Sequence, residues 1–210
     1  MFENIIKNVH NRHPLIHCIT NYVSINDCAN IVLACGGAPI MAEDINEVSQ
    51  ITSICQGLDI NIGMLNDNKL SSMLKAGATA NELGIPVILD PVGAGSSDYR
   101  IKAVQNLMSN VQFGVIRGNV SEIKAIAAKQ GIHNIAAGVY ETMQKNKSAM
   151  GVEAGIADKI TDDNIKEMAD FINKLSQKTG AVIAVTGGID MVADENRVYA
   201  IRNGHKMMSL

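Results

Sequence analysis

The sequence predicts an α/β three-layer sandwich, in which a mostly parallel central sheet with an antiparallel edge is flanked by helices. Short apolar runs such as Val87–Leu89 and Ala181–Val185 lack polar alternation, which is typical of strands buried on both faces of a parallel sheet. These runs alternate along the chain with amphipathic segments of helical length. Short alternating segments separated by turns follow the last buried run, and they predict the antiparallel edge.

The N-terminal part of the chain shows this alternation clearly. An amphipathic helix at Phe2–Val9 precedes a strand at Leu15–Ile19, and the glycines of Gly36–Pro39 predict a turn. The other elements expected here are a helix from a cap at Asn21 or Ser24 to about Cys35, a strand at Ile40–Ala42, a helix at Glu47–Gln56, a strand at Leu58–Ile62 and a helix at Asn68–Leu83.

The C-terminal part continues the pattern and then changes it. The expected elements are the strand Val87–Leu89, a helix from about Ser97 to Ser109, the strand Phe113–Ile116, a helix at Ser121–Gln130, a helix at Ile165–Gln177 and the strand Ala181–Val185. Residues 131–161 show no firm period. The segments Asp190–Ala193, Arg197–Ile201 and Met207–Leu210 are separated by turns, so an antiparallel meander is expected.

Composition excludes several classes of protein. The 210 residues predict one domain, residues 1–210, and 47% hydrophobic residues are ordinary for a globular protein. The net charge of −3 and the 3% aromatic content argue against nucleic acid or anionic membrane as a partner. Neither a signal peptide nor an apolar run of spanning length is visible, and the four cysteines lack ligand spacing. We therefore expect a cytoplasmic protein.

Asp90 is the first candidate site residue. It ends the buried run Val87–Leu89 and is followed by a proline and the glycines Gly93 and Gly95. Because ligands bind beyond the carboxyl ends of parallel strands, Asp90 is placed to meet a hydrated cation or a substrate. The glycines let backbone N–H groups approach an anion closely. The alternative is an ordinary turn, in which Asp before Pro is common.

A second buried strand ends in a similar way. Arg117 is followed by a glycine turn, Asn119 and Glu122, and if Ser121 caps the next helix, Glu122 lies in its first turn. Alone, Glu122 is explained by the helix dipole. Together with Asp90 it predicts a Mg²⁺–phosphate site, to which Arg117 adds a bidentate phosphate contact. These features favour a small-molecule kinase without a Walker-type loop.

Three further positions have weaker support. Thr186 precedes Gly187 and Gly188 at the end of another buried strand, which repeats the pattern or is an ordinary exit into a turn. Near the N-terminus, the segments around Asn21 and Met41 mix apolar residues with a few amide and hydroxyl groups. That mixture suits a small, largely apolar ligand, whereas the alternative for Met41 is a packing role in the core.

Taken in order, these segments resemble the hydroxyethylthiazole kinase family, thiamin-salvage enzymes of the ribokinase-like superfamily. The resemblance extends from about Pro14 to Leu210. It depends on Pro14–Asn21, Ala29–Asn30, Gly37–Ala42, Asn61–Gly63, Leu89–Gly95, Arg100, Ile116–Glu122, Thr186–Gly187, Asp190 and Asn203–His205. Each motif is short, but the ordered set is highly specific.

The resemblance implies ATP- and Mg²⁺-dependent phosphorylation of the primary alcohol of 4-methyl-5-(2-hydroxyethyl)thiazole. It assigns Asn21, Met41 and Gly63 to the thiazole pocket, Arg117, Asn119 and Thr186 to ATP binding, and Asp90 and Glu122 to the metal and phosphates. It also implies a homotrimer with thiazole pockets at the subunit junctions.

The sequence departs from the family pattern at its C-terminus. In the family, a Gly-rich turn with a cysteine follows the Asn-Gly-His strand, forms the anion hole and opens further helices, whereas this sequence stops at Leu210. We therefore expect a chain without that turn and those helices, with its catalytic residues beyond Leu210 and with poor turnover. The alternatives are a non-catalytic thiazole-binding remnant and another ribokinase-like kinase of small alcohols.

Overall fold

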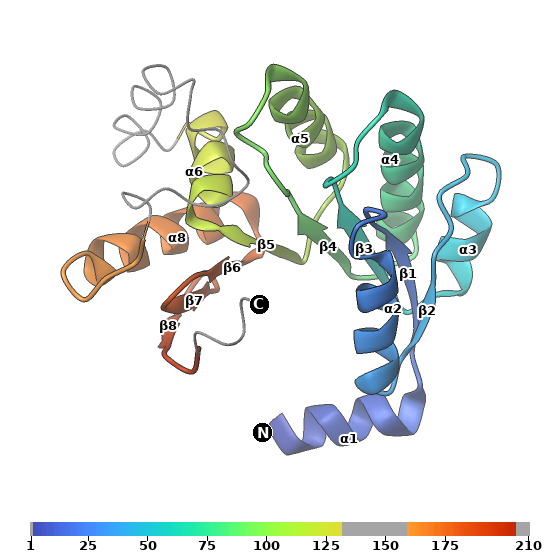
Figure 1. The fold of residues 1–210 in the computed structure, drawn as a ribbon, viewed down its shortest axis with the longest axis horizontal. Helices are drawn as coiled ribbons and strands as arrows, with labels where there is room; N and C mark the ends of the chain where they lie inside the picture. The colour runs from blue at the N-terminus through green and yellow to red at the C-terminus, as the bar shows by residue number, and fades with distance from the viewer. Residues whose placement is uncertain (1, 132–158, 205–210) are drawn as a thin grey trace. The chain divides into compact units, whose positions relative to one another are not determined.

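The computed structural model describes residues 2–131 and 159–204 (Figure 1). The chain divides into two compact units. The first comprises Met1–Asp90 and Asn106–Phe113, and the second comprises Pro91–Gln105 and Gly114–Leu210. Helix α5 (Asp98–Asn110) begins in the second unit and ends in the first.

The first unit is built on parallel strands. Its strands are β1 (Leu15–Ile19), β2 (Ala38–Ile40), β3 (Gly57–Asn61) and β4 (Val87–Asp90), in the order β2-β1-β3-β4. Its helices are α1 (Phe2–Arg12), α2 (Ile25–Ala34), α3 (Val48–Ile54) and α4 (Asp67–Glu82). In the register of β3 and β4, Asn61 lies opposite Asp90. The carboxyl ends of these two strands therefore bring an amide and a carboxylate side by side.

The core of the first unit lies between its strands and α4. Leu58 and Ile60 of β3 are buried, as are Met73 and Ala76 of α4. Gly77 of α4 permits a close approach, because a Cβ there would lie 2.5 Å from a methyl carbon of Val111. This packing fixes the direction in which α4 leaves the carboxyl end of β3.

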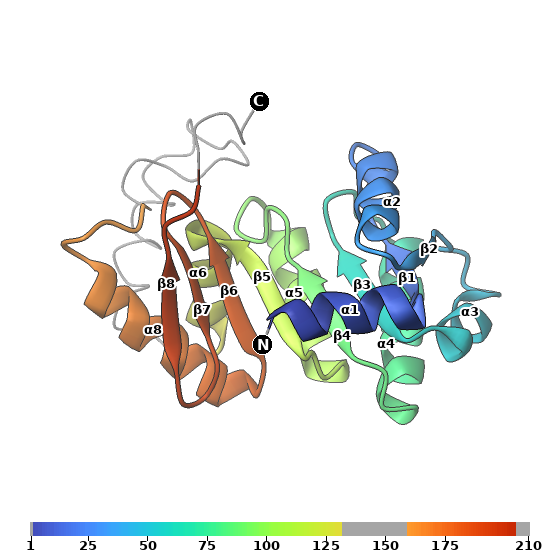
Figure 2. The ribbon, with the colours of Figure 1, turned by 90° about the horizontal axis from the view of Figure 1, so that it is seen from below.

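The second unit combines a parallel pair of strands with an antiparallel edge. Strands β5 (Val115–Asn119) and β6 (Val182–Thr186) are parallel, while β7 (Asp190–Ala193) and β8 (Val198–Ile201) continue antiparallel. Helix α6 (Val120–Lys129) packs on β5 and β6, and α8 (Ile165–Thr179) packs on β6 and β7 (Figure 2). Burial alternates along β6 and β7, so these helices cover one face of the strands.

The predicted fold class and most predicted elements are confirmed. Strand β2 begins at Ala38, two residues before the expected Ile40, because Gly36 takes a positive φ of 91° and completes the turn early. Pro39 is tolerated there since β2 is the last strand in the order β2-β1-β3-β4. Strand β5 extends to Asn119, opposite Thr186, and so passes beyond the expected end at Ile116.

Other expectations were wrong or are not tested. Strand Val87–Leu89 is not buried on both faces, because Ile88 is 40% exposed. Helix α6 is capped by Asn119 and not by Ser121. The segment Met207–Leu210 lies outside the described residues, as does most of residues 131–161. Within the described ranges, no helix combines the length and apolar character needed to cross a membrane.

Candidate active site

Asn61 joins three candidate site residues of the first unit. Its Nδ2 donates to Asp90 Oδ2 at 3.0 Å, and its Oδ1 accepts from Asn21 Nδ2 at 3.1 Å and from the Gly63 N–H at 2.8 Å. A carboxylate only accepts and a backbone N–H only donates, so these partners fix the orientation of the amide. Asn61 is 7% exposed. One buried amide therefore links the ends of β3 and β4 to the segment that follows β1.

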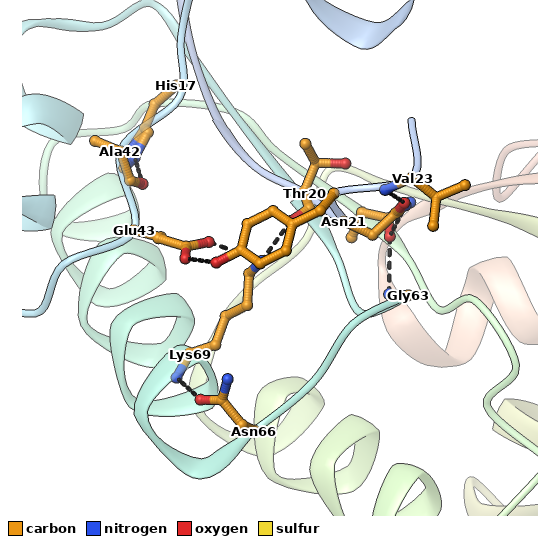
Figure 3. Close-up of polar contacts among 11 residues, drawn as sticks. His17, Thr20, Asn21, Val23, Ala42, Glu43, Gly63, Asn66 and Lys69 are labelled. Carbon is orange, nitrogen blue, oxygen red and sulfur yellow. Dashed lines mark hydrogen bonds and ion pairs between the residues drawn. The ribbon is translucent and has the colours of Figure 1, made fainter. Parts of the chain in front are cut away.

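Asn21 forms a turn as well as this link (Figure 3). Its Oδ1 accepts from the N–H groups of Val23 and Ser24, each at 3.0 Å, and from Ser24 Oγ at 3.2 Å. Ser24 is the N-cap of α2, but its side chain makes no capping hydrogen bond and accepts from Cys28 Sγ, at 3.8 Å. Asn21 therefore organises the start of α2. The sequence alone had predicted a cap at either Asn21 or Ser24.

Gly63 is required by the same contacts. A Cβ at Gly63 would lie 2.9 Å from Asn61 Oδ1 and 3.0 Å from Asn21 Nδ2. Such distances are shorter than normal van der Waals separations, so a side chain there would displace one of the two amides. The structure therefore brings Asn21, Gly63 and Asp90 together around Asn61.

Met41 lies on the loop after β2, and a buried histidine holds that loop. His17 Nε2 donates to the Ala42 carbonyl oxygen at 2.8 Å, and Thr52 Oγ1 lies 2.9 Å from His17 Nδ1. Burial lowers the pKa of His17 and outweighs the opposing effects of the Ala42 hydrogen bond and of Glu47. The neutral ring donates to Ala42 through Nε2, and Nδ1 faces Thr52, whose hydroxyl donates to the Val48 carbonyl oxygen at 2.7 Å.

In the second unit, Glu122 and Asn119 form a capping box. Asn119 Oδ1 accepts from the Glu122 N–H at 2.9 Å, and Glu122 Oε2 accepts from the Asn119 N–H at 2.8 Å. Glu122 Oε1 accepts from the Gly93 N–H at 2.8 Å. Glu122 is 7% exposed, and each of its carboxylate oxygens meets a backbone donor. It therefore holds the turn that follows Asp90 in sequence against the start of α6.

That turn is fixed at further points. Gly93 has a positive φ of 65°, which favours glycine, and its carbonyl oxygen accepts from Ser96 Oγ at 2.8 Å. Arg100 Nη1 donates to the Val92 carbonyl oxygen at 2.7 Å. The turn leads directly into α5, whose N-terminal N–H groups have the polarity that suits an anion.

Arg117, Asn119 and Thr186 lie on neighbouring strands of the second unit. Asn119 and Thr186 are paired at the carboxyl ends of β5 and β6, and Arg117 lies on β5 with an exposed side chain. Gly187 donates to Asp190 Oδ1 at 2.9 Å, which fixes the exit from β6. The second unit thus gathers Arg117, Asn119, Glu122 and Thr186, while the first unit gathers Asn21, Gly63 and Asp90.

The donor chemistry fits Mg²⁺ at Asp90. Mg²⁺ prefers hard oxygen ligands and is bound by one or two carboxylates together with water and phosphate oxygens. The described parts of the chain contain no cluster of three or more His, Cys, Asp or Glu side chains that could hold a metal ion by itself. Glu122 already receives two backbone N–H groups, so its geometry supports holding the glycine turn.

Sequence analysis assigned no site role to three residues that shape the first unit. These are His17, Asn61 and Lys69. The sequence does point to Asn61, because it lies at the carboxyl end of a buried strand, as Asp90 does. No local sequence pattern points to the roles of His17 and Lys69, because their hydrogen-bond partners are distant in sequence.

Comparison with solved structures identifies the class of fold. The chain superposes with a TM-score of 0.80 on a hydroxyethylthiazole kinase from Pyrococcus horikoshii OT3, at 31% identity, covering 98% of this chain and 68% of that one. It also shares its fold with a phosphomethylpyrimidine kinase from Clostridium difficile 630, at a TM-score of 0.58 and 12% identity, covering 90% and 85% of the two chains. The fold is therefore that of the ribokinase-like α/β kinases.

Sequence comparison gives the family. The profile of the hydroxyethylthiazole kinase family matches residues 6–162 and 132–210. A hydroxyethylthiazole kinase from Clostridium acetobutylicum is 52% identical over 209 residues, which covers 100% of this chain and 71% of the relative. The chain belongs to the hydroxyethylthiazole kinase family.

Proposed function

We propose that this chain phosphorylates the primary alcohol of 4-methyl-5-(2-hydroxyethyl)thiazole in thiamin salvage, with ATP as the phosphoryl donor. The observation that carries the proposal is 52% identity over the whole chain to an enzyme named hydroxyethylthiazole kinase. The reaction forms a bond between the substrate oxygen and the γ-phosphorus and breaks the bond to ADP. The substrate hydroxyl loses its proton in the process.

The first unit supplies the thiazole site in this proposal. The substrate is small and neutral, so it needs apolar contact and a few fixed polar groups. Met41 is assigned the apolar contact, and Asn21 and Gly63 are assigned the polar edge. The support comes from the hydrogen bonds of Asn61, which hold Asn21 and Gly63 in one geometry before any ligand binds. Such preorganisation favours affinity for a small ligand.

The second unit supplies the nucleotide contacts. Arg117, Asn119 and Thr186 are assigned to ATP binding, because the first carries a guanidinium that suits phosphate and the others lie at paired strand ends. Asp90 and Glu122 are assigned to the metal and phosphates, Asp90 as a ligand and Glu122 through the Gly93 turn that it holds. Bound Mg²⁺ would neutralise charge on the phosphates during transfer.

We also propose a cytoplasmic homotrimer with its thiazole pockets at subunit junctions. Support comes from the surface of α2, which contains no buried residue. Ile31 and Leu33 on this helix are both exposed, and Ile31 is 61% exposed. Apolar side chains gathered on one helix are typical of a surface that is covered in an assembly. Light scattering of the purified protein measures the assembly state directly.

The test of the proposed function is direct. The purified protein is incubated with ATP, Mg²⁺ and the thiazole alcohol, and the thiazole phosphate is followed by ³¹P NMR. We expect saturable product formation that requires both ATP and Mg²⁺. Absence of the phosphate under all these conditions would contradict the proposal.

Asp90→Asn separates the roles of the two sites. This change removes the negative charge that suits Mg²⁺ but keeps the shape of the side chain. We expect turnover with Mg²⁺-ATP to fall by about a hundredfold, as is typical when an electrostatic contact to the transferred group is lost. Thiazole binding measured by calorimetry should stay nearly intact. Equal loss of both properties would mean that Asp90 is structural.

A further inference from the structure

Lys69 is a buried cation that the proposed reaction does not use. It lies in the first turn of α4, where Asn66 caps the helix by accepting from the Lys69 N–H at 2.9 Å. Its side chain is 4% exposed. Burying a charged group is costly unless partners compensate it. Lys69 therefore needs strong polar partners, and the identity of those partners indicates its role.

The Lys69 ammonium has partners from two other segments (Figure 3). Its Nζ lies 2.7 Å from Glu43 Oε2 and donates a short hydrogen bond to the Thr20 carbonyl oxygen. It also lies 4.6 Å from the centre of the Tyr22 ring, which is within range of a cation–π contact. Tyr22 donates its hydroxyl hydrogen to Glu43 Oε1 in a short hydrogen bond. The four groups form a closed set of contacts.

The hydrogen bonds of this cluster determine the protonation of Glu43 and Tyr22. Burial raises the pKa of Glu43, but the hydrogen bonds from Lys69 and Tyr22 and the attraction of the ammonium together lower it further, so the net shift is downward. The hydrogen bond to Glu43 raises the pKa of the Tyr22 hydroxyl. At neutral pH Glu43 is therefore a carboxylate and Tyr22 a phenol.

The partners of Lys69 lie beside residues that we assign to the thiazole site. Thr20 and Tyr22 flank Asn21, and Glu43 follows Met41 by two positions. His17 holds the same loop through Ala42. The ammonium consequently connects α4 with the segment after β1 and with the loop after β2.

We propose that Lys69 is a positioning residue for the thiazole-alcohol site, where its ammonium fixes the segments Thr20–Tyr22 and Met41–Glu43 relative to each other. The identity of the ligand rests on the proposed function, whereas the tie between the two segments does not. Lys69 acts through Asn21 and Met41 and has no assigned contact with ATP. Its loss should therefore change thiazole binding selectively.

Lys69→Met tests this selectivity, because it keeps the length of the side chain and removes the charge. We expect the KM for the thiazole alcohol to rise by about tenfold or more, since both segments lose a hydrogen bond or ion pair to a charged group. In the same variant, the KM for ATP should change by less than about twofold. Lys69→Arg keeps the charge and should restore most of the thiazole affinity.

Lys75→Met is the matched control. Lys75 lies on the same helix, is exposed, and donates to the Ile45 carbonyl oxygen at 2.8 Å. Ile45 lies outside both Thr20–Tyr22 and Met41–Glu43, so both KM values should stay at the wild-type level. Equal rises in both KM values in Lys69→Met, without rescue by Lys69→Arg, would overturn the proposal.

Hydrogen exchange tests the tie without any ligand. The N–H groups of Val23 and Ser24 donate to Asn21 Oδ1 and report on the order of that segment. We expect these amides and the peptide Met41–Glu43 to exchange faster in Lys69→Met, while α8 is unchanged. Unchanged exchange in both segments would overturn the proposal. If the wild type neither binds nor phosphorylates the thiazole alcohol, the proposed function fails. Hydrogen exchange would still show whether Lys69 holds the segments Thr20–Tyr22 and Met41–Glu43 together.

Glu43→Gln keeps the test decisive if Lys69→Met does not fold. This change preserves the shape of the side chain, leaves one oxygen for Lys69, and removes the opposing charge. We expect faster exchange in the same two segments, and a rise of about threefold to tenfold in the thiazole KM alone. Wild-type exchange together with a wild-type thiazole KM would contradict the positioning role.

Discussion

The two units hold their candidate site residues in different ways. In the first unit, side chains bond to one another as well as to backbone groups: Asn61 bonds to Asn21 and Asp90, and Lys69 pairs with Glu43. In the second unit, the Glu122 carboxylate bonds to backbone, and it accepts from the N–H groups of Asn119 and Gly93. The difference matches the ligands that we assign. A neutral ring is recognised by shaped side chains, whereas an anion is recognised by N–H groups and a guanidinium.

The units also differ in the sequence distance between partners. The Asn21–Asn61 contact spans 40 positions and the Lys69–Thr20 contact spans 49. The capping box of Asn119 and Glu122 spans three, although Glu122 also reaches Gly93 across 29. Local contacts form as soon as the helix does, whereas distant contacts need the packed unit. Substitutions in the first unit should therefore disturb more of the surrounding structure.

Asn61→Asp should produce the largest effect. It keeps the shape of the side chain but places a second carboxylate at the position from which Nδ2 donates to Asp90 Oδ2 at 3.0 Å. Because like charges at this distance repel strongly, we expect kcat/KM for the thiazole alcohol to fall by about a hundredfold or more. Steady-state kinetics with each substrate varied in turn provides the measurement.

Asn110→Asp is the control for this change. Asn110 is exposed at the end of α5, and its side chain bonds to Asn106. We expect its kinetics to match the wild type. If Asn61→Asp were as active as Asn110→Asp, the side-chain network of the first unit would not support the site.

Glu122→Gln should have a smaller and different effect. The amide keeps one acceptor oxygen, so it cannot accept from both Asn119 and Gly93, and its NH₂ group faces one of these donors. We expect the KM for ATP to rise by about tenfold, while the thiazole dissociation constant stays unchanged. The free energy of unfolding should fall by about 1 kcal/mol, because one backbone N–H group loses its acceptor.

Glu167→Gln is the matched control in the same unit. Glu167 lies in the first turn of α8, is exposed, and the helix that carries it has no side-chain cap bond. Calorimetric titration with each ligand and urea denaturation should both give wild-type values. A rise in the thiazole dissociation constant for Glu122→Gln would remove the distinction between the two units.

The fold could be predicted because its signals are local. Apolar runs locate β1, β3, β4 and β6, and amphipathic periods locate α4 and α8. The shifts at β2 and β5 show the limit: strand ends depend on pairing, and Asn119 belongs to β5 because Thr186 lies opposite it. Ile88 is exposed although it lies in an apolar run, since coverage of a strand is a property of the packed structure.

The candidate site could be predicted where its pattern is local. Asn119 and Glu122 lie three positions apart, and that spacing predicts the first turn of a helix, although Ser121 was the expected cap. Lys69 gave no such signal. Within the expected helix Asn68–Leu83 it is one lysine among polar residues, and only the packed structure places its ammonium against Glu43 and Thr20.

The smallest effect that we expect in the first unit is on the pH dependence of its stability, through His17. His17 is fully buried, and burial lowers its pKa from the ordinary value of 6.5. The unfolded chain therefore binds a proton near pH 6.5 that the folded chain binds only at lower pH. Stability is full above about pH 6.5 and falls as the pH drops below it, with a slope of at most about 1.4 kcal/mol per pH unit. Urea denaturation between pH 7.5 and about pH 5 measures this slope.

His17→Gln removes the titrating group, and its amide can still donate to the Ala42 carbonyl oxygen. We expect the variant to be less stable than the wild type at pH 7.5 but to lose less stability on acidification. His10→Gln, at an exposed histidine of α1, should keep the wild-type slope. If His17→Gln kept that slope too, the loss on acidification would come from other groups. The loop that carries Met41 would then be held by His17 without being sensitive to its protonation.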